Sequence, residues 1–168
     1  MNHVPVRDLE HNLLWDQHEF ALSNALCIWA NYFVVPTMTR AETSLGLNRD
    51  DCNVLISLWL YETVTASDIC FLVGRPRNSI SRAVNRLLER KYIKAAPNSA
   101  DARKSDLTMT NHGKAVMSEL IPIFAERQNL MLRRLGKRQQ IALHRLLGET
   151  LKDASRWAED LPLNGSGN

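Results

Sequence analysis

The chain has 168 residues, which is enough for one ordinary domain with a substantial core. Its hydrophobic fraction of 45%, charged fraction of 23% and net charge of +3 are ordinary for a globular protein, and they exclude a disordered or collagen-like chain. The sequence has neither an apolar run that could span a bilayer nor an export signal at its start, so we expect a cytoplasmic protein without membrane contact.

The first expected element is one long helix over residues 8–35, which carries leucine and aromatic residues at helical spacing and is ended by Pro36. A helix this rich in apolar side chains needs a partner. A second, buried helix is expected over residues 48–62. Asn48 is a good N-cap for it, and Asp51 lies in the first turn, where the helix dipole favours negative charge.

A short helix and then a basic helix come next. Thr65 and Asp68 form the pattern of a capping box at the start of the short helix, and Gly74 ends it. The helix expected over residues 78–91 has one apolar stripe, opposite a polar and basic face. The stripe consists of Ile80, Ala83, Val84, Leu87 and Leu88. A short capped helix, a glycine-containing turn and a basic helix together predict a helix-turn-helix.

Two short extended stretches, residues 92–96 and 105–108, follow the basic helix and are joined by turn-forming residues. They predict a hairpin. Residues 75–104 hold nine basic side chains against Glu89 and Asp101, a net charge of +7, so the rest of the chain carries −4. Positive charge concentrated in this way is typical of a protein that binds a polyanion.

Two further helices are expected in the last part of the chain. Thr110 caps the first and Pro122 should kink it before it ends near residue 135, and the second should run from about residue 137 to 160. Because these helices have more apolar surface than a small lobe needs, we expect residues 110–160 to join residues 8–35 in a homodimer interface. The tail, residues 162–168, is expected to be disordered.

This order of elements resembles that of the MarR family of bacterial transcriptional regulators. The family's recognition helix is similar to the segment RNSISRAVNRLLERKYI, residues 77–93. Its wing is similar to PNSADARKSDLTMTNHGK, residues 97–114, in which Asp101 and Arg103 occupy the Asp-x-Arg positions of the wing tip. The resemblance is close from about residue 48 to residue 113, and it covers the flanking helices only by arrangement.

At other positions of the wing and the turn, some residues match the family pattern and others depart from it. Thr110 and Gly113 match the Thr-x-x-Gly opening of the helix after the wing. Ala102 stands where the family often has a basic residue, which would weaken affinity for the minor groove. Arg75 stands where an apolar residue is common, which would add a phosphate contact.

The resemblance implies a single domain over residues 1–168 that is mainly α with a small β-wing. Residues 48–109 would form a winged helix-turn-helix lobe, and the long N- and C-terminal helices would form a dimerisation lobe. Proteins of this family bind a pseudo-palindromic operator in double-stranded DNA as homodimers. Repression is the family-level expectation, with release by a small aromatic or phenolic effector.

In such a protein the basic helix reads base edges in the major groove and the hairpin reaches an adjacent minor groove. Arg103 is the expected minor-groove probe, while Asp101 would orient a basic side chain of the wing or only stabilise the turn. The expected DNA-contacting residues are Arg75, Arg77, Asn78, Ser79, Ser81, Arg82, Arg86, Lys94, Asp101, Arg103 and Lys104. Alternatively, the residues of the basic helix in this set form only the solvent-exposed face of an amphipathic helix and contact no DNA.

An effector site would lie between the dimerisation helices and the DNA-binding lobe, as the resemblance implies. Its candidate residues are His11, Trp15, His18 and Trp29, which follow one stripe of the first helix, and Arg40, which could pair with an anionic ligand. The stripe is equally compatible with core or dimer interface, and Arg40 with an exposed position. The two histidines have no third candidate ligand at a spacing typical of a metal site, so we expect no metal site and no cofactor.

The three cysteines, Cys27, Cys52 and Cys70, are odd in number and lie among apolar residues, so buried free thiols are expected. Cys27 nevertheless resembles the helix-1 cysteine of the family's peroxide-sensing branch, which leaves a thiol switch open.

An enzyme is not expected, because the sequence lacks a phosphate-binding glycine loop, G-x-S-x-G, paired metal-binding histidines on a helix and Cys-x-x-Cys. A winged-helix module that serves only protein contacts is a further alternative. A steep fall of DNA affinity with salt would distinguish a DNA-binding protein from it.

Overall fold

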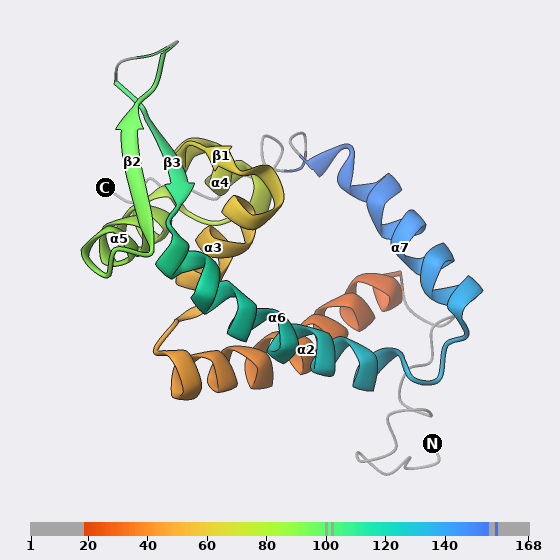
Figure 1. Cartoon of the computed structure of the whole chain (residues 1–168). Coiled ribbons are helices and arrows are strands. Elements are labelled where there is room, and N and C mark those ends of the chain that lie inside the picture. Colours follow the sequence, from red (N-terminus) through yellow and green to blue (C-terminus); the bar gives the residue numbers. More distant parts are fainter. Residues whose placement is uncertain (1–18, 100, 102, 155–156, 158–168) are drawn as a thin grey trace, which may run out of the picture.

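The computed structural model describes residues 19–99, 101, 103–154 and 157. In chain order its elements are α2 (Ala21–Leu45), α3 (Arg49–Tyr61), β1 (Thr63–Val64), α4 (Ala66–Val73), α5 (Arg77–Glu89), β2 (Ile93–Pro97), β3 (Ser105–Met109), α6 (Asn111–Leu132) and α7 (Lys137–Leu151). Figure 1 shows that α3, α4, α5 and the sheet gather into one lobe, which we call the winged-helix lobe. α2 and α6 pack side by side, and α7 extends away from them. The predicted fold class, mainly α with a small β-wing, is confirmed.

A three-stranded antiparallel sheet forms the wing, with the strand order β1-β3-β2. β2 and β3 pair over five positions, from Ile93 opposite Met109 to Pro97 opposite Ser105, which confirms the predicted hairpin. β1 adds a short strand on the other side of β3, with Thr63 opposite Thr108. The sequence does not predict β1, because two residues are too few to show an alternating pattern.

Three helices start at the caps that the sequence predicts. The side chain of Asn48 accepts a hydrogen bond from the backbone amide of Asp51 at 3.0 Å, and the carboxylate of Asp51 accepts one from the amide of Asn48 at 3.1 Å. This reciprocal pair is a capping box. Thr65 and Asp68 form the same arrangement at α4, and Thr110 caps α6.

The prediction that the first helix ends at Pro36 is wrong. α2 passes through Pro36 and ends at Gly46, whose left-handed backbone (φ 63°) closes the helix. A proline has no amide to donate to the carbonyl four residues earlier, here that of Tyr32. Arg127 of α6 supplies the missing donor, because its Nε lies 2.8 Å from the Tyr32 oxygen and its Nη2 bonds the same atom. The carbonyl that Pro36 leaves without a backbone donor is therefore bonded by a side chain of α6.

The core of the winged-helix lobe confirms the apolar stripe predicted for α5. Ile80, Ala83, Val84 and Leu87 are buried, and Leu88 is half-buried. Residues from several elements complete this core, among them Ala41, Leu55, Ile69, Leu107 and Leu120. Since Ala41 belongs to α2 and Leu120 to α6, the long helices are anchored in the same core as the winged-helix lobe.

The expectation of buried thiols holds for only one cysteine. Cys52 is buried, and this burial raises the pKa of its thiol to about 12. Cys70 is half-buried, and the pKa of its thiol is raised, mainly because of this burial. Cys27, on α2, is exposed.

The last two helices differ in their bounds from the prediction. α6 contains Pro122 and ends at Leu132, three residues earlier than expected. α7 is described over Lys137–Leu151, and the expected tail at residues 162–168 lies outside the described residues. No residue of α7 is buried. Within the described part of the chain, no helix is both long and apolar enough to cross a membrane.

Candidate nucleic-acid interface

The outward face of α5 carries polar residues that the sequence assigns to DNA. The helix begins directly after Pro76, whose φ of −58° suits a helix entry. The exposed residues of this face are Arg77, Asn78, Ser81 and Arg82, and Ser79 is half-buried. Among the described residues Arg77 and Arg82 form no ion pair, so these two guanidinium groups face solvent rather than a carboxylate.

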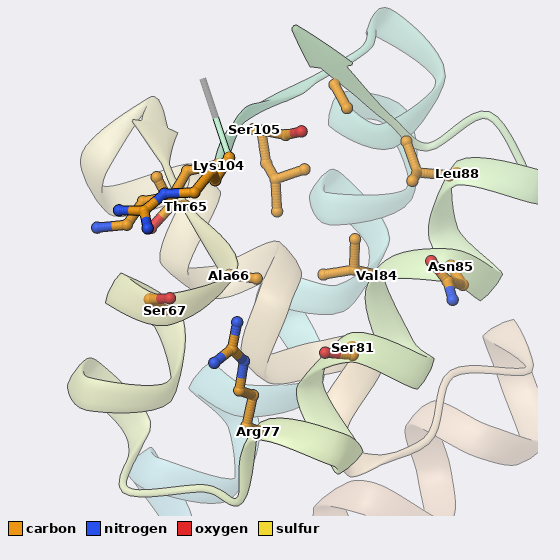
Figure 2. Close-up of a pocket in the computed structure, with 13 residues that line it drawn as sticks. Thr65, Ala66, Ser67, Arg77, Ser81, Val84, Asn85, Leu88, Lys104 and Ser105 are labelled. Atoms are coloured by element: carbon orange, nitrogen blue, oxygen red, sulfur yellow. The ribbon is translucent and has the colours of Figure 1, made fainter. Parts of the chain in front are cut away.

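A groove of about 270 Å³ lies between α5, the start of α4 and the wing (Figure 2). Its polar lining consists of Thr65, Ser67, Arg77, Ser81, Asn85, Arg103, Lys104 and Ser105. Val84, Leu88 and Leu107 contribute apolar surface. Three of the lining side chains are cations and none is a carboxylate, so the groove favours an anion.

Four of the polar residues that line this groove were not among the predicted site residues, and one of them, Thr65, was predicted only as the cap of α4. Asn85 comes four residues after Ser81, so a projection of α5 along its axis could have added it. Ser67 and Ser105 come from α4 and β3. No local pattern marks these two serines, because only the packing of three elements brings them beside α5.

The tip of the wing holds its arginine with two hydrogen bonds. Nε of Arg103 lies 3.0 Å from Oδ1 of Asp101, and Nη2 lies 3.2 Å from Oδ2. Asp101 also accepts a hydrogen bond from the amide of Arg103, while its own amide donates to Asn98. Asp101 therefore both closes the turn and orients the arginine. These hydrogen bonds from Arg103 also lower the pKa of the Asp101 carboxyl.

This arrangement leaves Arg103 available to a ligand. Its side chain is 90% exposed even though it is paired with Asp101. Lys104, the next residue, is exposed as well, and Lys94 is exposed on β2, opposite Thr108 of β3. The wing thus presents a pre-oriented guanidinium with further cations on the same hairpin.

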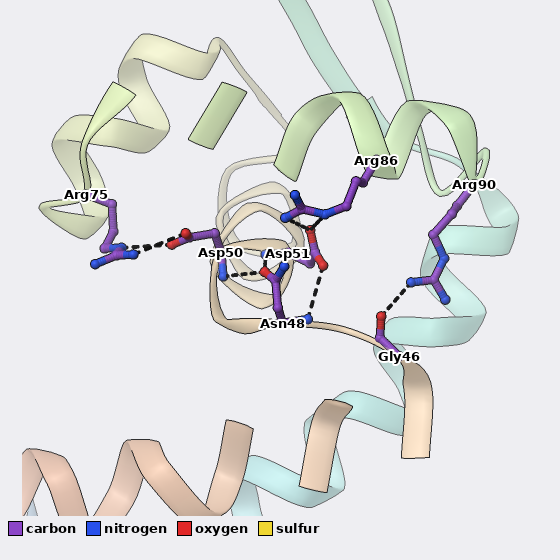
Figure 3. A network of polar contacts seen from close by, with 7 residues as sticks. All are labelled: Gly46, Asn48, Asp50, Asp51, Arg75, Arg86 and Arg90. Atoms are coloured by element: carbon purple, nitrogen blue, oxygen red, sulfur yellow. Dashed lines mark hydrogen bonds and ion pairs between the residues drawn. The ribbon is translucent and has the colours of Figure 1, made fainter. Parts of the chain in front are cut away.

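Arg75 has a structural partner rather than the solvent-facing position expected for it. Its Nε and Nη2 lie 2.8 and 3.1 Å from the two carboxylate oxygens of Asp50, in the first turn of α3 (Figure 3). The hydrogen bond from Arg75 is the main cause that lowers the pKa of Asp50. A guanidinium held in this way joins the turn before α5 to α3, and its predicted phosphate contact stays a prediction.

Arg86 is engaged in the same manner, and its predicted DNA contact likewise stays a prediction. Nη2 and Nε of Arg86 lie 2.8 and 3.1 Å from Oδ1 of Asp51, a carboxylate with only 3% of its residue surface exposed (Figure 3). A buried carboxylate needs a charged partner. Because Arg86 and Asp51 are 35 positions apart, no local sequence pattern indicates the pair.

The two candidate effector residues that the structure describes, Trp29 and Arg40, do not line the same cavity. His11, Trp15 and His18 lie outside the described residues. Trp29 stacks on Phe33 with 5.9 Å between ring centroids. Arg40 forms an ion pair with Glu126 of α6 and lines a cavity of about 190 Å³ between α2 and α6, to which Trp29 does not contribute. Arg40 comes eleven positions after Trp29, which is about 16 Å along a helix axis.

Residues 45–104 match the sequence model of the MarR family. No curated protein sequence matches the chain at a significant level. A similar solved structure is that of a MarR transcriptional regulator from Methanosarcina mazei Go1, with a TM-score of 0.71 and 15% identity over 80% of this chain and 96% of the other.

Two further solved structures with this fold have functional descriptions. BpsR from Bordetella bronchiseptica, whose DNA binding is regulated by 6-hydroxynicotinic acid, has a TM-score of 0.66 and 19% identity over 77% of this chain and 97% of its own. A mutant MarR from E.coli, complexed with operator DNA, has a TM-score of 0.65 and 16% identity over 86% of this chain and 99% of its own.

The family match covers the winged-helix lobe from α3 to residue 104, directly before β3, and the structural likenesses extend the same fold over the long helices. The lobe has the elements of that fold in order, from the capped α3 to the wing. The winged-helix lobe therefore matches the MarR family over residues 45–104, and the chain has the winged helix-turn-helix fold of MarR transcriptional regulators.

Proposed function

We propose that the protein is a cytoplasmic transcriptional repressor that binds a pseudo-palindromic DNA operator as a homodimer. The observation that carries the proposal is the cationic surface shared by α5 and the wing, which borders a groove without a carboxylate. The likeness to a MarR protein that was crystallised with operator DNA supports it. The proposed activity is binding, with no catalytic step.

In this proposal the two parts of the surface contact different grooves of one duplex. The exposed N-terminal half of α5 enters the major groove, where Arg77 and Arg82 would bond guanine edges. Arg103 enters the adjacent minor groove, held by Asp101, and its planar guanidinium suits the negative potential of a narrow groove. Contacts to phosphates or base edges would come from Asn78, Ser79, Ser81, Lys94 and Lys104.

Arg75 and Arg86 receive a different role from the one expected of them. Each donates two hydrogen bonds to a carboxylate of the first turn of α3. They would act on DNA indirectly, by fixing α5 and the turn before it against α3. Their replacement should lower stability as well as affinity.

A salt titration tests the proposal. The affinity for a duplex that the protein has selected from a random pool should fall steeply with salt, because several phosphate contacts release counterions. For Arg103→Ala the slope of log affinity against log salt should become shallower by about one. Arg138→Ala, which removes an exposed cation of α7, is the matched control and should leave the slope unchanged. A wild-type affinity that does not respond to salt would favour a module used only for protein contacts.

The proposed homodimer is supported by the apolar surface that one chain leaves exposed. The exposed apolar side chains of the long helices are Leu22, Leu26, Trp29, Tyr32 and Val35 on α2, Ile121 and Leu130 on α6, and Ile141, Leu146 and Leu151 on α7. A helix of 15 residues with nothing buried is marginal alone in water. A second copy of the chain would cover these faces.

Sedimentation measures this association directly. The wild type should sediment as a dimer, and the double change Ile141→Asp and Leu146→Asp should give a monomer with weakened operator binding. Arg145→Ala changes an exposed polar residue of the same helix and should leave the dimer intact. A wild-type chain that is monomeric at the concentrations that saturate DNA would contradict the dimer.

We further propose regulation by a small aromatic or phenolic ligand that contacts the long helices. The aromatic cluster of Trp29, Phe33 and Phe124 supports it, with Phe33 and Phe124 edge to face at 5.8 Å. Arg40, although paired with Glu126, is 55% exposed and could exchange that partner for a carboxylate ligand. His11, Trp15 and His18 stay candidates. BpsR, with a related fold, responds to an aromatic acid.

A thermal-shift screen of aromatic acids tests this regulation, since a ligand that binds the folded dimer raises its Tm by mass action. A ligand of the proposed kind should also weaken operator binding, and Trp29→Ala and Arg40→Ala should reduce its Tm shift. A screen in which no aromatic acid changes both Tm and operator affinity would count against the proposal.

The exposed position of Cys27 favours a second mode of regulation. A peroxide would oxidise the thiol to a sulfenic acid and release water. Oxidation should then lower operator affinity in the wild type and leave Cys27→Ser unaffected. Equal responses of the two proteins would remove this alternative.

A further inference from the structure

Arg90, at the C-terminal end of α5, bonds the C-terminal end of α2 (Figure 3). Its Nη1 donates to the carbonyl of Gly46 at 2.8 Å, and its Nη2 donates to the carbonyl of Leu45 at 3.0 Å. The recognition helix and a long helix that supports dimerisation in our proposal are therefore joined by one guanidinium. We call this contact the Arg90 bridge.

The chemistry of a helix end explains why an arginine suits this place. The last carbonyls of a helix lack amide donors, and the helix dipole makes that end partly negative. Gly46 closes α2 in a left-handed conformation, and a Cβ added there would lie 3.6 Å from Nη2 of Arg90. The end of α2 thus presents two carbonyl oxygens to a planar cation at close range.

The bridge continues from Arg90 to the start of α6. Nη2 of Arg90 also lies 2.9 Å from the hydroxyl of Tyr92, and the guanidinium lies 4.6 Å from the centroid of that ring. Tyr92 in turn contacts His112, in the first turn of α6. The two rings meet edge to face, with 4.7 Å between their centroids. Arg90 and Tyr92 thereby tie the end of α5 to both long helices.

We propose that Arg90 is a positioning residue that sets the orientation of α5 relative to α2, and with it the spacing of DNA half-sites that the dimer accepts. The inference rests on the proposed function. Arg90 lies at the opposite end of α5 from the exposed residues that would enter the major groove, and its Nη1 and Nη2 donate hydrogen bonds to protein oxygens. We therefore expect Arg90 to affect DNA binding through the orientation of α5 and not through a contact with DNA.

Affinity as a function of half-site spacing tests this inference. The probe is the inverted-repeat duplex that the wild type selects from a random pool, with one base pair added to or removed from its centre. Such a change moves the half-sites by about 3.4 Å and turns them by about 35°, so a rigid dimer should lose about tenfold or more in affinity. With Arg90→Met the penalty should fall to about threefold or less, because a looser α5 adapts to either spacing.

The spacing profile distinguishes positioning from two simpler roles. A variant that is only less stable, or that lacks a phosphate contact, loses affinity by the same factor at every spacing. Arg82→Met, which removes a proposed groove contact, should behave in this way and serves as the matched control on the same helix. Arg90→Lys keeps a cation that can bond the α2 carbonyls, and it should restore part of the wild-type spacing penalty.

Pulsed EPR gives a readout that does not depend on DNA. Spin labels on p-acetylphenylalanine introduced at the exposed positions Glu42 of α2 and Asn78 of α5 report the distance between the two helices. An excess of unlabelled protein limits the signal to pairs within one chain. The distance distribution should be narrow in the wild type and broader with Arg90→Met, whereas Glu89→Gln, at the neighbouring exposed position, should leave it narrow.

The outcomes separate the two proposals. If the wild type binds no duplex, the proposed function fails, and the EPR distributions still decide whether Arg90 positions α5. If the wild type binds DNA and Arg90→Met keeps both its spacing penalty and its narrow distance distribution, the inference about Arg90 is wrong and the proposed function stands.

Discussion

Gly113, in the first turn of α6, lies close to the backbone that leads into β2. A Cβ added to it would lie 2.1 Å from the carbonyl oxygen of Tyr92 and 2.8 Å from Cγ of Met109. Since the nearer atom belongs to the backbone, it cannot move aside as a flexible side chain would. This contact gives a physical reason for glycine in the Thr-x-x-Gly opening of α6.

We predict that Gly113→Ala lowers the free energy of unfolding by about 2–3 kcal/mol, as measured by urea denaturation. Gly148→Ala is the control, because a Cβ at Gly148 of α7 meets nothing within 4 Å. It should stabilise the protein by about 0.5–1 kcal/mol through helix propensity. A Gly113→Ala protein as stable as the wild type would contradict the close approach.

The pair of Pro36 and Arg127 offers a second test at single residues. Arg127→Met should lower the free energy of unfolding by about 1–2 kcal/mol, because it leaves the Tyr32 carbonyl without a donor. In the Pro36→Ala background the alanine amide can bond the Tyr32 carbonyl. Arg127→Met should therefore lower the free energy of unfolding by less in that background. A double-mutant cycle measures the coupling. Additive effects of the two substitutions would show that Arg127 does not compensate for the proline.

At the scale of the elements, α3 is held to the turn before α5 by an ion pair with a defined pH dependence. Arg75 lowers the pKa of Asp50 from its ordinary value of 3.8. The unfolded chain then binds this proton more readily than the folded one. The stabilisation is therefore present above the ordinary pKa and is lost as pH falls through the lowered pKa of the folded state.

We predict that this loss is specific to the pair. Between about pH 6 and about pH 3, the free energy of unfolding should fall more in the wild type than in Arg75→Met, which has no pair to lose. Urea denaturation at each pH measures the difference. Equal pH dependences would show that Asp50 and Arg75 do not interact in solution.

What the sequence predicts about the elements depends on how local their causes are. The capping boxes at Asn48 and Thr65 involve residues three positions apart, and the apolar stripe of α5 repeats every three or four residues, so both could be found without a structure. The passage of α2 through Pro36 could not, because the donor that bonds the Tyr32 carbonyl is an arginine on another helix. β1 was missed because a two-residue strand has no pattern.

The same distinction applies to the candidate site. The exposure of Arg77, Arg82 and Arg103 follows from positions on a helix face and a hairpin tip, and the sequence places these correctly. Arg75 and Arg86 belong to the same charged segment, yet their carboxylate partners lie 25 and 35 positions away. Charge alone therefore cannot separate arginines that face solvent from arginines that hold the lobe together.

At the scale of the whole molecule, one chain leaves many apolar side chains of its long helices exposed, while its winged-helix lobe is built on a buried core. This division supports two tasks: the lobe would contact DNA, and α2, α6 and α7 would associate with a second copy. The Arg90 bridge lies where the two parts meet, at the end of α2. Half-site spacing and dimer geometry are consequently expected to depend on each other.

The central claim is that α5 and the wing of each subunit contact one duplex at the same time. Hydroxyl-radical footprinting tests it, because these radicals cleave the backbone from the minor groove. With the wild type on its selected duplex, we predict protection in the minor grooves that flank both half-sites. Arg103→Ala should remove this flanking protection while the half-sites stay bound at higher protein concentration. A footprint without flanking minor-groove protection, or one that Arg103→Ala leaves unchanged, would contradict the account.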